Sequence, residues 1–452
     1  MPAPVLLWLR QDLRLHDQPA FAAAAQQGPV IPVYVLDDET PGNWRIGGAQ
    51  RWWLHHSLES LAATLEAAGS RLILRRGKAE AVLRKLLAET SASCIHALRH
   101  YEPWWRAAET GLGNALRLHD GNHLVRPDAV KTGAGSAYRI FSSFWKALAP
   151  ALPPHDPVPA PEHLPAPDAW PASDVLDEWR LLPVRPNWAT GFDWHPGEDE
   201  ALAKAEAFRS RVADYEEQRN LPAQAGTSQL SPHLHFGELS PRMLWRTIGD
   251  APDALKFHKE LAWRDFTASL VDALPRYAEQ EGRAAMAHIP WRTGPQASQD
   301  LQAWQRGLTG YPIVDAGMRQ LWVSGWMHNR VRMITASFLV KHLLIDWREG
   351  ERWFWETLID ADYGNNAVNW QWVAGTGIDA NMFTRIMAPL SQSEKFAAGD
   401  YIRRWVPELA GVPDPAIHDP DAHGCRPADY PAKIIGHLEA RERALTANRS
   451  IR

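Results

Sequence analysis

The sequence predicts a two-part fold, with an α/β N-terminal domain built on a doubly wound parallel sheet and an all-helical C-terminal domain. Two observations predict it. Short apolar runs alternate with helical patterns in the first part of the chain, whereas helical periodicity with few strand signals dominates from about Asp199 onward. A proline-rich stretch separates the two patterns. We therefore expect the α/β domain at residues 1–130, a connector at 131–198 and the helical domain at 199–452.

Five apolar runs predict the strands of the sheet. The segments between them, such as Arg51–Ala68, have helical periodicity, so helices should cover both faces. Domains of this kind bind ligands at the carboxyl ends of the strands, which leaves room for a small second cofactor. No G-x-G-x-x-G motif follows the first run, which argues against a dinucleotide-binding domain. The predicted strands are Val5–Leu9, Val30–Leu36, Arg71–Leu74, Cys94–Leu98 and His123–Val125.

The proline-rich stretch predicts an extended connector. Eleven of the 35 prolines lie between Pro150 and Pro186. Proline lacks a backbone N–H and restricts its neighbours, so neither a helix nor a sheet is expected at this density. The connector should wrap or span the two domains without taking part in chemistry.

In the helical part, the most informative stretch runs from Trp322 to Trp372. Its centre, Met333–Ile345, is nearly all apolar and contains no Gly or Pro, which predicts a buried helix. Asp360 and Asp362 follow, and a buried carboxylate needs a partner, for which Arg332 is the natural candidate. One interpretation is a structural ion pair in a tryptophan-rich core. The convergence of two Asp, an Asn and spaced Trp favours a pocket for a polar aromatic ligand.

Two further segments contain polar motifs. In G-T-S-x-L-S, the hydroxyl groups offer donors to an anion and Ser231-Pro232 predicts the start of a helix, although a simple capped helix is the alternative. Glu260, Trp263 and Arg264 are spaced i, i+3 and i+4, so they share one helix face. A surface ion pair beside an aromatic residue would produce the same pattern.

The composition excludes several classes of protein. The chain has 452 residues and a net charge of −5. Because its overall charge is negative, any nucleic-acid site must be a local basic patch. Cys94 and Cys425 provide neither a disulfide framework nor a zinc or iron–sulfur site, and we expect no metal. The N-terminus lacks a signal peptide and no apolar run approaches a membrane span. We expect a cytoplasmic monomer without a membrane partner.

Three stretches resemble a known family. The block GWMHNRVRMITASFLVKHLLIDWREGE, followed by D-x-D-x-x-x-N-x-x-x-W-Q-W, is similar to the FAD pocket of the DNA photolyase/cryptochrome family, and LLWLRQDLRLHDQPAF is similar to its opening signature. The resemblance covers nearly the whole chain and is strongest to bacterial cyclobutane pyrimidine dimer photolyases. It implies the photolyase/cryptochrome architecture, with an antenna-type α/β domain and a helical FAD-binding domain.

The resemblance implies a site for FAD. The G-T-S-x-L-S segment would hold the diphosphate, Asp360 would pair with Arg332, and Asp362 would hydrogen-bond the edge of the flavin ring. Asn366 would face flavin N5, where an amide supports the reduced anionic flavin without adding a competing charge. The residues implied in FAD binding are Tyr215, Thr227, Ser228, Leu230, Ser231, Phe257, Arg264, Asn329, Arg332, Asp360, Asp362 and Asn366.

The resemblance also implies a pocket for a DNA lesion beside the flavin. Glu260 would contact and protonate a pyrimidine dimer and Trp263 would stack on it, because aromatic walls replace the stacking that a flipped-out base loses. The residues implied in substrate binding are Glu260, Trp263, Asn329, Met333 and Trp372, with Arg330, Arg385 and Lys395 for DNA phosphates and Arg403 and Arg404 as further candidates.

Three tryptophans fall where the family places its electron-transfer chain. These are Trp370, Trp347 and Trp291, in order from the flavin outward, and the alternative is that they are ordinary core residues. Together with Glu260 and Asn366 they are the residues implied in catalysis.

The activity implied is light-driven repair of cyclobutane pyrimidine dimers, in which photoexcited FADH⁻ passes an electron to a flipped-out dimer. Photolyases for (6-4) photoproducts of the animal type have His at the positions of Asn329 and Met333, and the iron–sulfur type needs four Cys, so cyclobutane repair is favoured. The expected partner is double-stranded DNA containing dimers, and also single-stranded DNA, which would associate the protein with the nucleoid.

The predictions of the antenna chromophore and of the function both have alternatives. The antenna chromophore is expected to be methenyltetrahydrofolate, with deazaflavin as the alternative. The rival function is a cryptochrome-like blue-light photoreceptor without repair activity, and a third is a light-independent flavoprotein oxidoreductase. The presence of Asn366 and of the complete lesion pocket argues against the photoreceptor.

Overall fold

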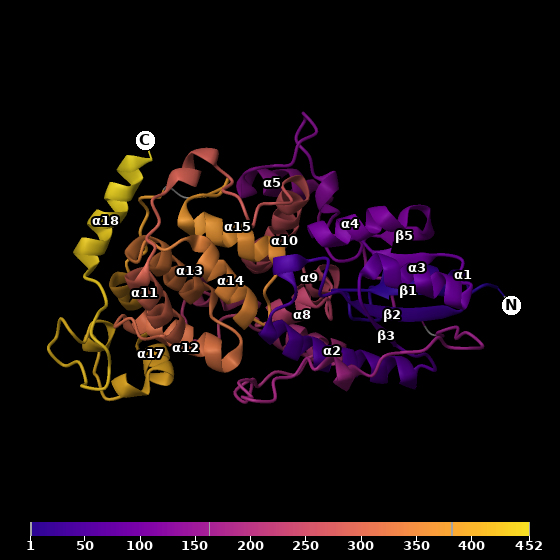
Figure 1. Cartoon of the computed structure of the whole chain (residues 1–452), viewed down its shortest axis with the longest axis horizontal. Coiled ribbons are helices and arrows are strands. Elements are labelled where there is room, and N and C mark those ends of the chain that lie inside the picture. The colour runs from indigo at the N-terminus through magenta and orange to yellow at the C-terminus, as the bar shows by residue number, and fades with distance from the viewer. Residues whose placement is uncertain (1, 162, 381–382, 452) are drawn as a thin grey trace.

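In the computed structural model, which describes residues 2–161, 163–380 and 383–451, the N-terminal part of the chain forms a five-stranded sheet (Figure 1). Neighbouring strands are parallel, in the order β3-β2-β1-β4-β5. Two strands begin slightly later than the apolar runs that predict them. The strands are β1 (Val5–Leu9), β2 (Val30–Leu36), β3 (Ile73–Arg76), β4 (Ile95–Leu98) and β5 (Leu116–His119).

Helices cover both faces of this sheet, so the prediction of a doubly wound α/β domain is confirmed. Successive side chains of a strand point to opposite faces. Leu7 of β1 belongs to the buried cluster that contains Phe21 and Trp53, whereas Trp8 belongs to the cluster that contains Leu83 and residues of the opposite helices. The helices are α1 (Pro19–Gln27) and α2 (Gly48–Ala67) on the first face, and α3 (Ala79–Thr90) and α4 (Pro103–Leu112) on the second.

The prediction of a strand at His123–Val125 is wrong. These residues form a loop, in which the backbone amides of Leu124 and Val125 donate to the carboxylate of Asp265 at 3.4 and 3.1 Å instead of to a neighbouring strand. The fifth strand is β5, which precedes this loop. Its sequence, LRLH, alternates polar and apolar residues at a partly exposed sheet edge, so it contains no apolar run that the sequence analysis could detect.

The proline-rich connector lies along the α/β domain (Figure 1). The backbone amides of Asp17 and Val30 donate to the carbonyl groups of Val158 and Pro165, both at 2.7 Å, and Leu164 packs into the same core cluster as α1 and α2. Its described residues between 150 and 186 form no α-helix or strand. The connector therefore wraps the first domain.

The remainder of the chain is helical, with the C-terminal helix at the opposite end of the long axis from the N-terminus (Figure 1). Between these helices lie short 3₁₀ turns. The helices are α5 (Phe141–Leu148), α6 (Glu198–Arg209), α7 (Tyr215–Gln218), α8 (Ser231–His235), α9 (Pro241–Ile248), α10 (Leu255–Ala273), α11 (Pro295–Arg306), α12 (Pro312–Ser324), α13 (Asn329–Ser337), α14 (Trp347–Thr357), α15 (Tyr363–Ala374), α16 (Pro389–Lys395), α17 (Gly399–Trp405) and α18 (His437–Ser450).

The predicted central helix is present and buried, but a π-helical turn divides it. After α13 the chain continues as a π-helical turn, η9 (Phe338–His342), in which the amide of Leu343 donates to the carbonyl of Phe338 at 3.0 Å. Leu344 then has a left-handed φ of 51°, which ends the helix. A π-turn inserts one residue into a helical turn and so rotates the side chains that follow. Apolar composition alone cannot reveal that rotation.

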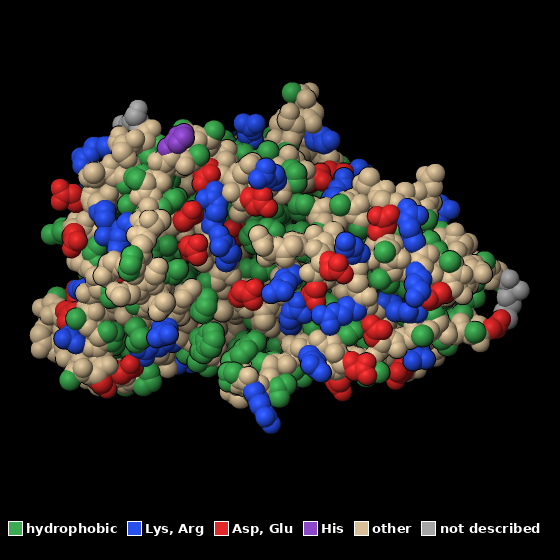
Figure 2. Space-filling view, in the orientation of Figure 1, with side chains coloured by type: hydrophobic (Ala, Val, Ile, Leu, Met, Phe, Trp, Pro, Cys, Tyr) green, Lys and Arg blue, Asp and Glu red, His purple; other side chains and the backbone are tan. Residues whose placement is uncertain are grey.

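Two further properties follow from the described part of the chain. It contains no helix that is long and apolar enough to cross a membrane. On the face shown in Figure 2, Lys and Arg side chains are interspersed with Asp and Glu, in keeping with the modest net charge of −5. A basic site for DNA would have to be local.

Candidate active site

A cavity of about 480 Å³ opens among α7, α8, α10, α13 and α15. Every residue predicted to bind FAD lines it, and so do most residues predicted to contact the lesion. The structure thus brings together segments more than a hundred residues apart in sequence. Of the other predicted residues, Glu260, Trp263, Met333, Trp372, Arg330 and Trp370 line the cavity, whereas Arg385, Lys395, Trp347 and Trp291 do not.

The G-T-S-x-L-S segment forms one end of the cavity. Gly226 lets this loop lie against α7, because a Cβ at this position would stand 2.6 Å from the carbonyl oxygen of Gln218. Thr227 and Ser228 then line the cavity with their hydroxyl groups, and α8 begins at Ser231 as predicted. This end offers neutral hydrogen-bond donors to an anionic ligand.

The ion pair predicted between Asp360 and Arg332 is present. Two guanidinium nitrogens of Arg332 donate to the Asp360 carboxylate at 3.0 and 2.8 Å, and its Nε donates to the carbonyl of Met327 at 2.7 Å. The Ser231 hydroxyl donates to Asp360 Oδ2 at 2.6 Å. While this bond is present, the Ser231 hydroxyl cannot donate to a ligand. The donors that remain for an anion are the hydroxyl groups of Thr227 and Ser228 and the backbone amides.

Asp362 and Asn366 lie at the start of α15, at another side of the cavity. Asp362 caps the helix, with Oδ1 accepting the amide of Asn365 at 2.7 Å, and its carboxylate also lines the cavity. The Asn366 side chain donates from Nδ2 to the carbonyl of Glu351 at 3.1 Å. This bond uses one of the two amide N–H groups, so the second N–H and the acceptor Oδ1 are left for a ligand.

Glu260 and Trp263 on α10 are both held by neighbours from other elements. Glu260 forms an ion pair with Arg219, whose guanidinium lies 5.2 Å from the ring centre of Tyr215. Trp263 stacks on Phe141 of α5, with ring centres 3.9 Å apart and planes within 9°. One face of the indole is therefore covered, and Trp263 lines the cavity with the rest of its surface.

Arg330 and Met333 form part of the cavity wall on α13. Arg330 donates to Asn220 Oδ1 at 2.6 and 3.2 Å and lies 4.6 Å from the ring centre of Phe396. Burial and the neighbouring Arg219 lower the pKa of its guanidinium. Arg330 is thus fixed as a wall residue, with its guanidinium 3.7 Å from Met333 Sδ.

Comparison with known proteins agrees with this geometry. The family model described as DNA photolyase matches residues 5–164, and the model described as FAD binding domain of DNA photolyase matches residues 257–450. The deoxyribodipyrimidine photo-lyase of Agrobacterium fabrum is 45% identical over 100% of this chain and 98% of that protein. Cryptochrome-1 of Arabidopsis thaliana is 33% identical over 97% of this chain and 69% of that protein. The crystal structure of a bacterial class III photolyase from Agrobacterium tumefaciens has a TM-score of 0.93, is 45% identical, and matches 100% of this chain and 98% of that one.

The chain belongs to the DNA photolyase family. The photolyase/cryptochrome architecture predicted from the sequence is confirmed, and so is FAD as the cofactor.

The residues of the cavity fit the chemistry of FAD. Hydroxyl groups lie at the end predicted for the diphosphate, Leu230, Ala336 and Val373 provide apolar walls, and the carboxylate of Asp362 and the amide of Asn366 face the cavity from α15. A mostly apolar cleft with a few placed polar groups is what an aromatic dinucleotide cofactor requires.

The three tryptophans predicted for electron transfer have different surroundings, from the cavity wall at Trp370 to the partly exposed Trp291. Trp370 packs against Gly350, where a Cβ would stand 2.1 Å from the indole Cη2. Trp347 is fully buried, and Trp291 is half-buried beside Phe383, with ring centres 6.3 Å apart. This order, from cavity to surface, is the one that the electron-transfer prediction needs, and the electron-transfer role stays a prediction.

The basic residues predicted for DNA phosphates divide into two groups. Lys395 is exposed and lies 5.5 Å from the ring centre of Phe396, close to Arg330, and Arg385 is exposed and electrostatically coupled to Arg330. Arg403, in contrast, pairs with Asp400 at 2.8 Å and with Asp414 at 3.3 Å, so it is held by structural ion pairs.

The sequence analysis missed several residues that line the cavity. Arg219 follows Tyr215 by four residues, a helical spacing that could have revealed it. Trp326 donates from Nε1 to the Ser231 hydroxyl at 3.3 Å. His235 lines the same cavity, and burial lowers its pKa to about 4. No pattern in the sequence distinguishes these two from ordinary core residues.

A second cavity of about 240 Å³ lies at the carboxyl ends of β4 and β5, lined by Arg99, Asp120, His123 and others. This is the edge of the sheet where the sequence analysis left room for a small second cofactor. The identity of the antenna chromophore stays a prediction.

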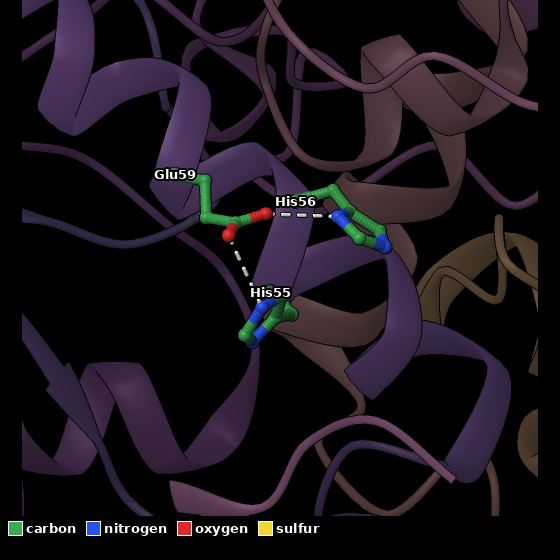
Figure 3. Close-up of side chains that lie close together, drawn as sticks. All are labelled: His55, His56 and Glu59. Carbon is green, nitrogen blue, oxygen red and sulfur yellow. Dashed lines mark hydrogen bonds and ion pairs between the residues drawn. The ribbon is translucent and has the colours of Figure 1, made fainter. Parts of the chain in front are cut away.

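A third group of side chains lies on α2, outside both cavities. The Glu59 carboxylate points at His55 and His56, at 3.4 and 2.9 Å (Figure 3). Asp177 lies 3.9 Å from His55, and both carboxylates are more than half exposed. The two carboxylates and His56 lie at the surface, whereas the His55 ring is buried and its Nδ1 has no hydrogen-bond partner among the described residues.

Proposed function

We propose that this chain repairs cyclobutane pyrimidine dimers in DNA under blue or near-ultraviolet light, acting as a monomer on double- or single-stranded DNA that contains the lesion. When bound, reduced FAD supplies the electron that splits the dimer after absorption of light. The observation that carries the proposal is that the predicted FAD-binding and lesion-binding residues line one continuous cavity.

The chain's own residues divide the cavity into a cofactor side and a lesion side. Thr227 and Ser228 would hold the diphosphate, and Asn366 Oδ1 would accept a hydrogen bond from the flavin. Trp263 and Trp372 provide aromatic surface for a flipped-out dimer, and Met333 provides an apolar wall. Stacking on such surfaces replaces the stacking lost when bases leave the duplex.

Glu260 is the acid that the proposal assigns to the dimer. Its side chain is partly exposed, which lets a substrate reach it, and its ion pair with Arg219 fixes its position. In its protonated form, a carboxyl at this place can hydrogen-bond a pyrimidine carbonyl and donate a proton to it. Arg330, Arg385 and Lys395 would contact DNA phosphates beside the cavity, so binding should weaken as salt rises and should depend little on base sequence.

The test is a repair assay. The purified protein is reduced, mixed with an oligonucleotide carrying a thymine dimer and illuminated with blue light, and the recovery of absorbance from intact bases is followed. We expect light-dependent recovery that falls at least about tenfold in Glu260→Ala and in Trp372→Ala, the range expected for loss of one acid or one stacking surface.

Two matched variants serve as controls. Glu216→Ala removes an exposed carboxylate from α7, and Trp322→Ala removes a half-exposed indole from α12, both outside the cavity. Neither should change repair. Absence of recovery from protein with FAD bound and reduced would reject the proposal and favour a cryptochrome-like photoreceptor, for which a light-dependent partner would then be sought.

A further inference from the structure

A small chamber adjoins the cofactor cavity on the side of the α/β domain. Its volume is about 30 Å³, enough for one or two water molecules. His100, Glu102 and Asn122 line it from the α/β side, and Arg264 and Asp362 from the helical side. Arg264 and Asp362 also line the larger cavity, so the two spaces share a wall.

The charged groups around the chamber are unequal in number. Burial keeps the imidazoles neutral: it lowers the pKa of His100 well below its ordinary value, that of His123 to about 3 and that of His235 to about 4. The cation that lines the chamber is Arg264, and the carboxyl groups are Glu102 and Asp362.

The cations near the chamber cannot neutralise both carboxyl groups. Arg264 donates to the carbonyl oxygens of Leu234 and Asn122, at 3.0 and 3.5 Å. Arg10, which also acts on Glu102, donates to Glu109 at 2.8 Å. Since these bonds hold both cations away from direct pairing with Glu102 or Asp362, the two carboxyl groups repel each other when both are ionised.

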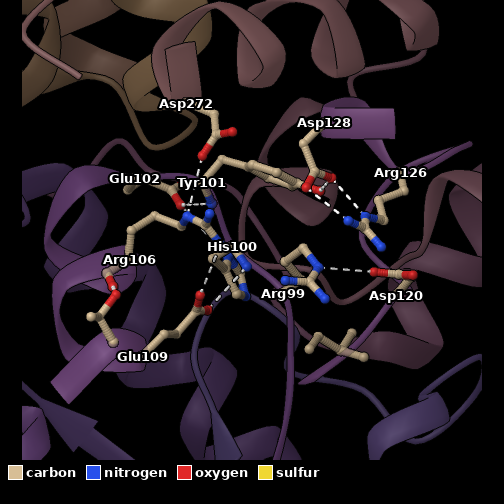
Figure 4. A network of polar contacts seen from close by, with 12 residues as sticks. Arg99, His100, Tyr101, Glu102, Arg106, Glu109, Asp120, Arg126, Asp128 and Asp272 are labelled. Carbon is tan, nitrogen blue, oxygen red and sulfur yellow. Dashed lines mark hydrogen bonds and ion pairs between the residues drawn. The ribbon is translucent and has the colours of Figure 1, made fainter. Parts of the chain in front are cut away.

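Glu102 is the carboxyl group that is less well supported. It precedes α4 and is buried, with Oε2 accepting the backbone amide of Tyr101 at 3.1 Å and with His100 Nδ1 3.8 Å away (Figure 4). Burial and the nearby Asp362 raise the pKa of Glu102 to about 7. Asp362 likewise accepts one backbone amide, that of Asn365, but it is only partly buried.

We propose that Glu102 is a redox-linked proton-binding site, which takes up a proton when negative charge is added to the cofactor at the Asp362 side of the larger cavity. Reduction of FAD to FADH⁻ consumes two electrons and one proton and adds one negative charge. That charge favours protonation of Glu102, whose carboxylate then takes a further proton from solvent through the chamber. The proposal rests on FAD binding and not on the identity of the DNA lesion.

The proton stoichiometry of reduction tests this proposal. The FAD-loaded protein, without DNA, is reduced electrochemically in weakly buffered solution, and proton uptake is measured with an indicator dye from about pH 6 to about pH 9. Wild type should take up more than one proton per two electrons around and above neutral pH. Glu102→Gln should take up one proton across the range. Uptake of only one proton by wild type, or an unchanged excess in Glu102→Gln, would overturn the proposal.

A matched control comes from the same pair of helices. Asp272 on α10 faces Arg106 on α4 at 3.2 Å and lines neither space (Figure 4). Asp272→Asn should retain the wild-type excess of proton uptake. Loss of the excess in this variant as well would show that the effect comes from the packing of α4 against α10 and would contradict the assignment to Glu102.

A second measurement covers the case in which Glu102→Gln fails to retain FAD. The reduced-minus-oxidised infrared difference spectrum of wild type should gain a carboxylic acid C=O band that shifts when glutamate is isotopically labelled. Asp labelling should leave the band in place, which separates Glu102 from Asp265. Absence of a glutamate-sensitive band would overturn the proposal whether or not the protein repairs dimers, because the repair assay is performed separately on the same preparation.

Discussion

The two spaces that share Asp362 and Arg264 differ in size, lining and origin. The larger cavity, of about 480 Å³, is built by the helical domain and combines apolar walls with a few polar groups. The chamber, of about 30 Å³, is built by both domains and is lined mainly by polar side chains. An organic ligand needs apolar contact area, whereas a polar chamber of this size has room only for water molecules.

The wall formed by Asp362 and Arg264 therefore borders two spaces suited to different chemistry. Asp362 lines the larger cavity on one side and the water-sized chamber on the other. The larger cavity depends on side chains held in place by ion pairs and stacking, so truncating them should lower stability or affinity. The chamber depends on the balance of buried charge, so changes there should appear as pH dependence.

The largest effect should come from the ion pair in the wall of the larger cavity. Asp360→Ala leaves Arg332 and Ser231 without their carboxylate partner. Since removal of one member strands a largely buried charge, we expect a loss of roughly 3 kcal/mol in the free energy of unfolding, measured by urea denaturation. Glu206→Ala, which breaks an exposed pair with Arg209, should change it by less than about 1 kcal/mol. Equal effects of the two variants would show that the Asp360 pair is not structurally important.

The chamber should produce a pH-dependent effect of comparable size. The pKa of Glu102 rises from an ordinary 4.5 to about 7 on folding, so between these values the folded chain binds more protons than the unfolded chain. Stability therefore falls as pH rises through this window. Gln cannot ionise, so Glu102→Gln should match wild type near pH 4.5 and exceed its stability by about 3 kcal/mol well above pH 7. A difference that does not change with pH would contradict this account.

The stacking surface of the larger cavity should have a moderate effect on binding. Trp372→Ala removes an aromatic wall from the predicted lesion side. Because stacking of a base on an aromatic side chain is worth about 1–3 kcal/mol, affinity for dimer-containing DNA should fall at least about fivefold in a fluorescence titration. Affinity for undamaged DNA should stay the same. A parallel loss for both DNAs would place Trp372 in general DNA binding instead.

The smallest effect should come from outside both spaces. Glu59→Ala removes the exposed carboxylate that pairs with His55 and His56 on α2. Exposed ion pairs contribute little, so the free energy of unfolding should change by less than about 1 kcal/mol and bound FAD should be retained. A change comparable to that of Asp360→Ala would mean that this surface group is coupled to the cofactor cavity.

Local patterns in the sequence were sufficient for much of the architecture. Alternation of apolar runs with helical periodicity predicted the doubly wound sheet, because burial on both faces requires continuous apolar strands. The sequence pointed to Arg332 as a candidate partner for a buried carboxylate, and the family resemblance assigned it to Asp360; the structure contains this ion pair. Family resemblance added the assignment of individual residues to the flavin and the lesion, which neither periodicity nor composition could provide.

Other features depended on contacts between segments far apart in the chain. β5 was missed because an edge strand needs no apolar run, and the predicted strand at His123–Val125 instead gives its amides to Asp265 on α10. The division of the central helix by a π-turn depends on how its two halves pack.

The sequence by itself determined which residues are polar, aromatic or apolar and in what order, and hence the fold class and the cofactor cavity's main ingredients. Only the tertiary structure decided which like charges lie close together without a directly paired counter-charge. Glu102 and Asp362 are separated by 260 residues, and their coupling arises from a chamber that the two domains enclose together. The pKa of a buried group depends on solvent exclusion and on neighbours in space, neither of which is a local property of the chain.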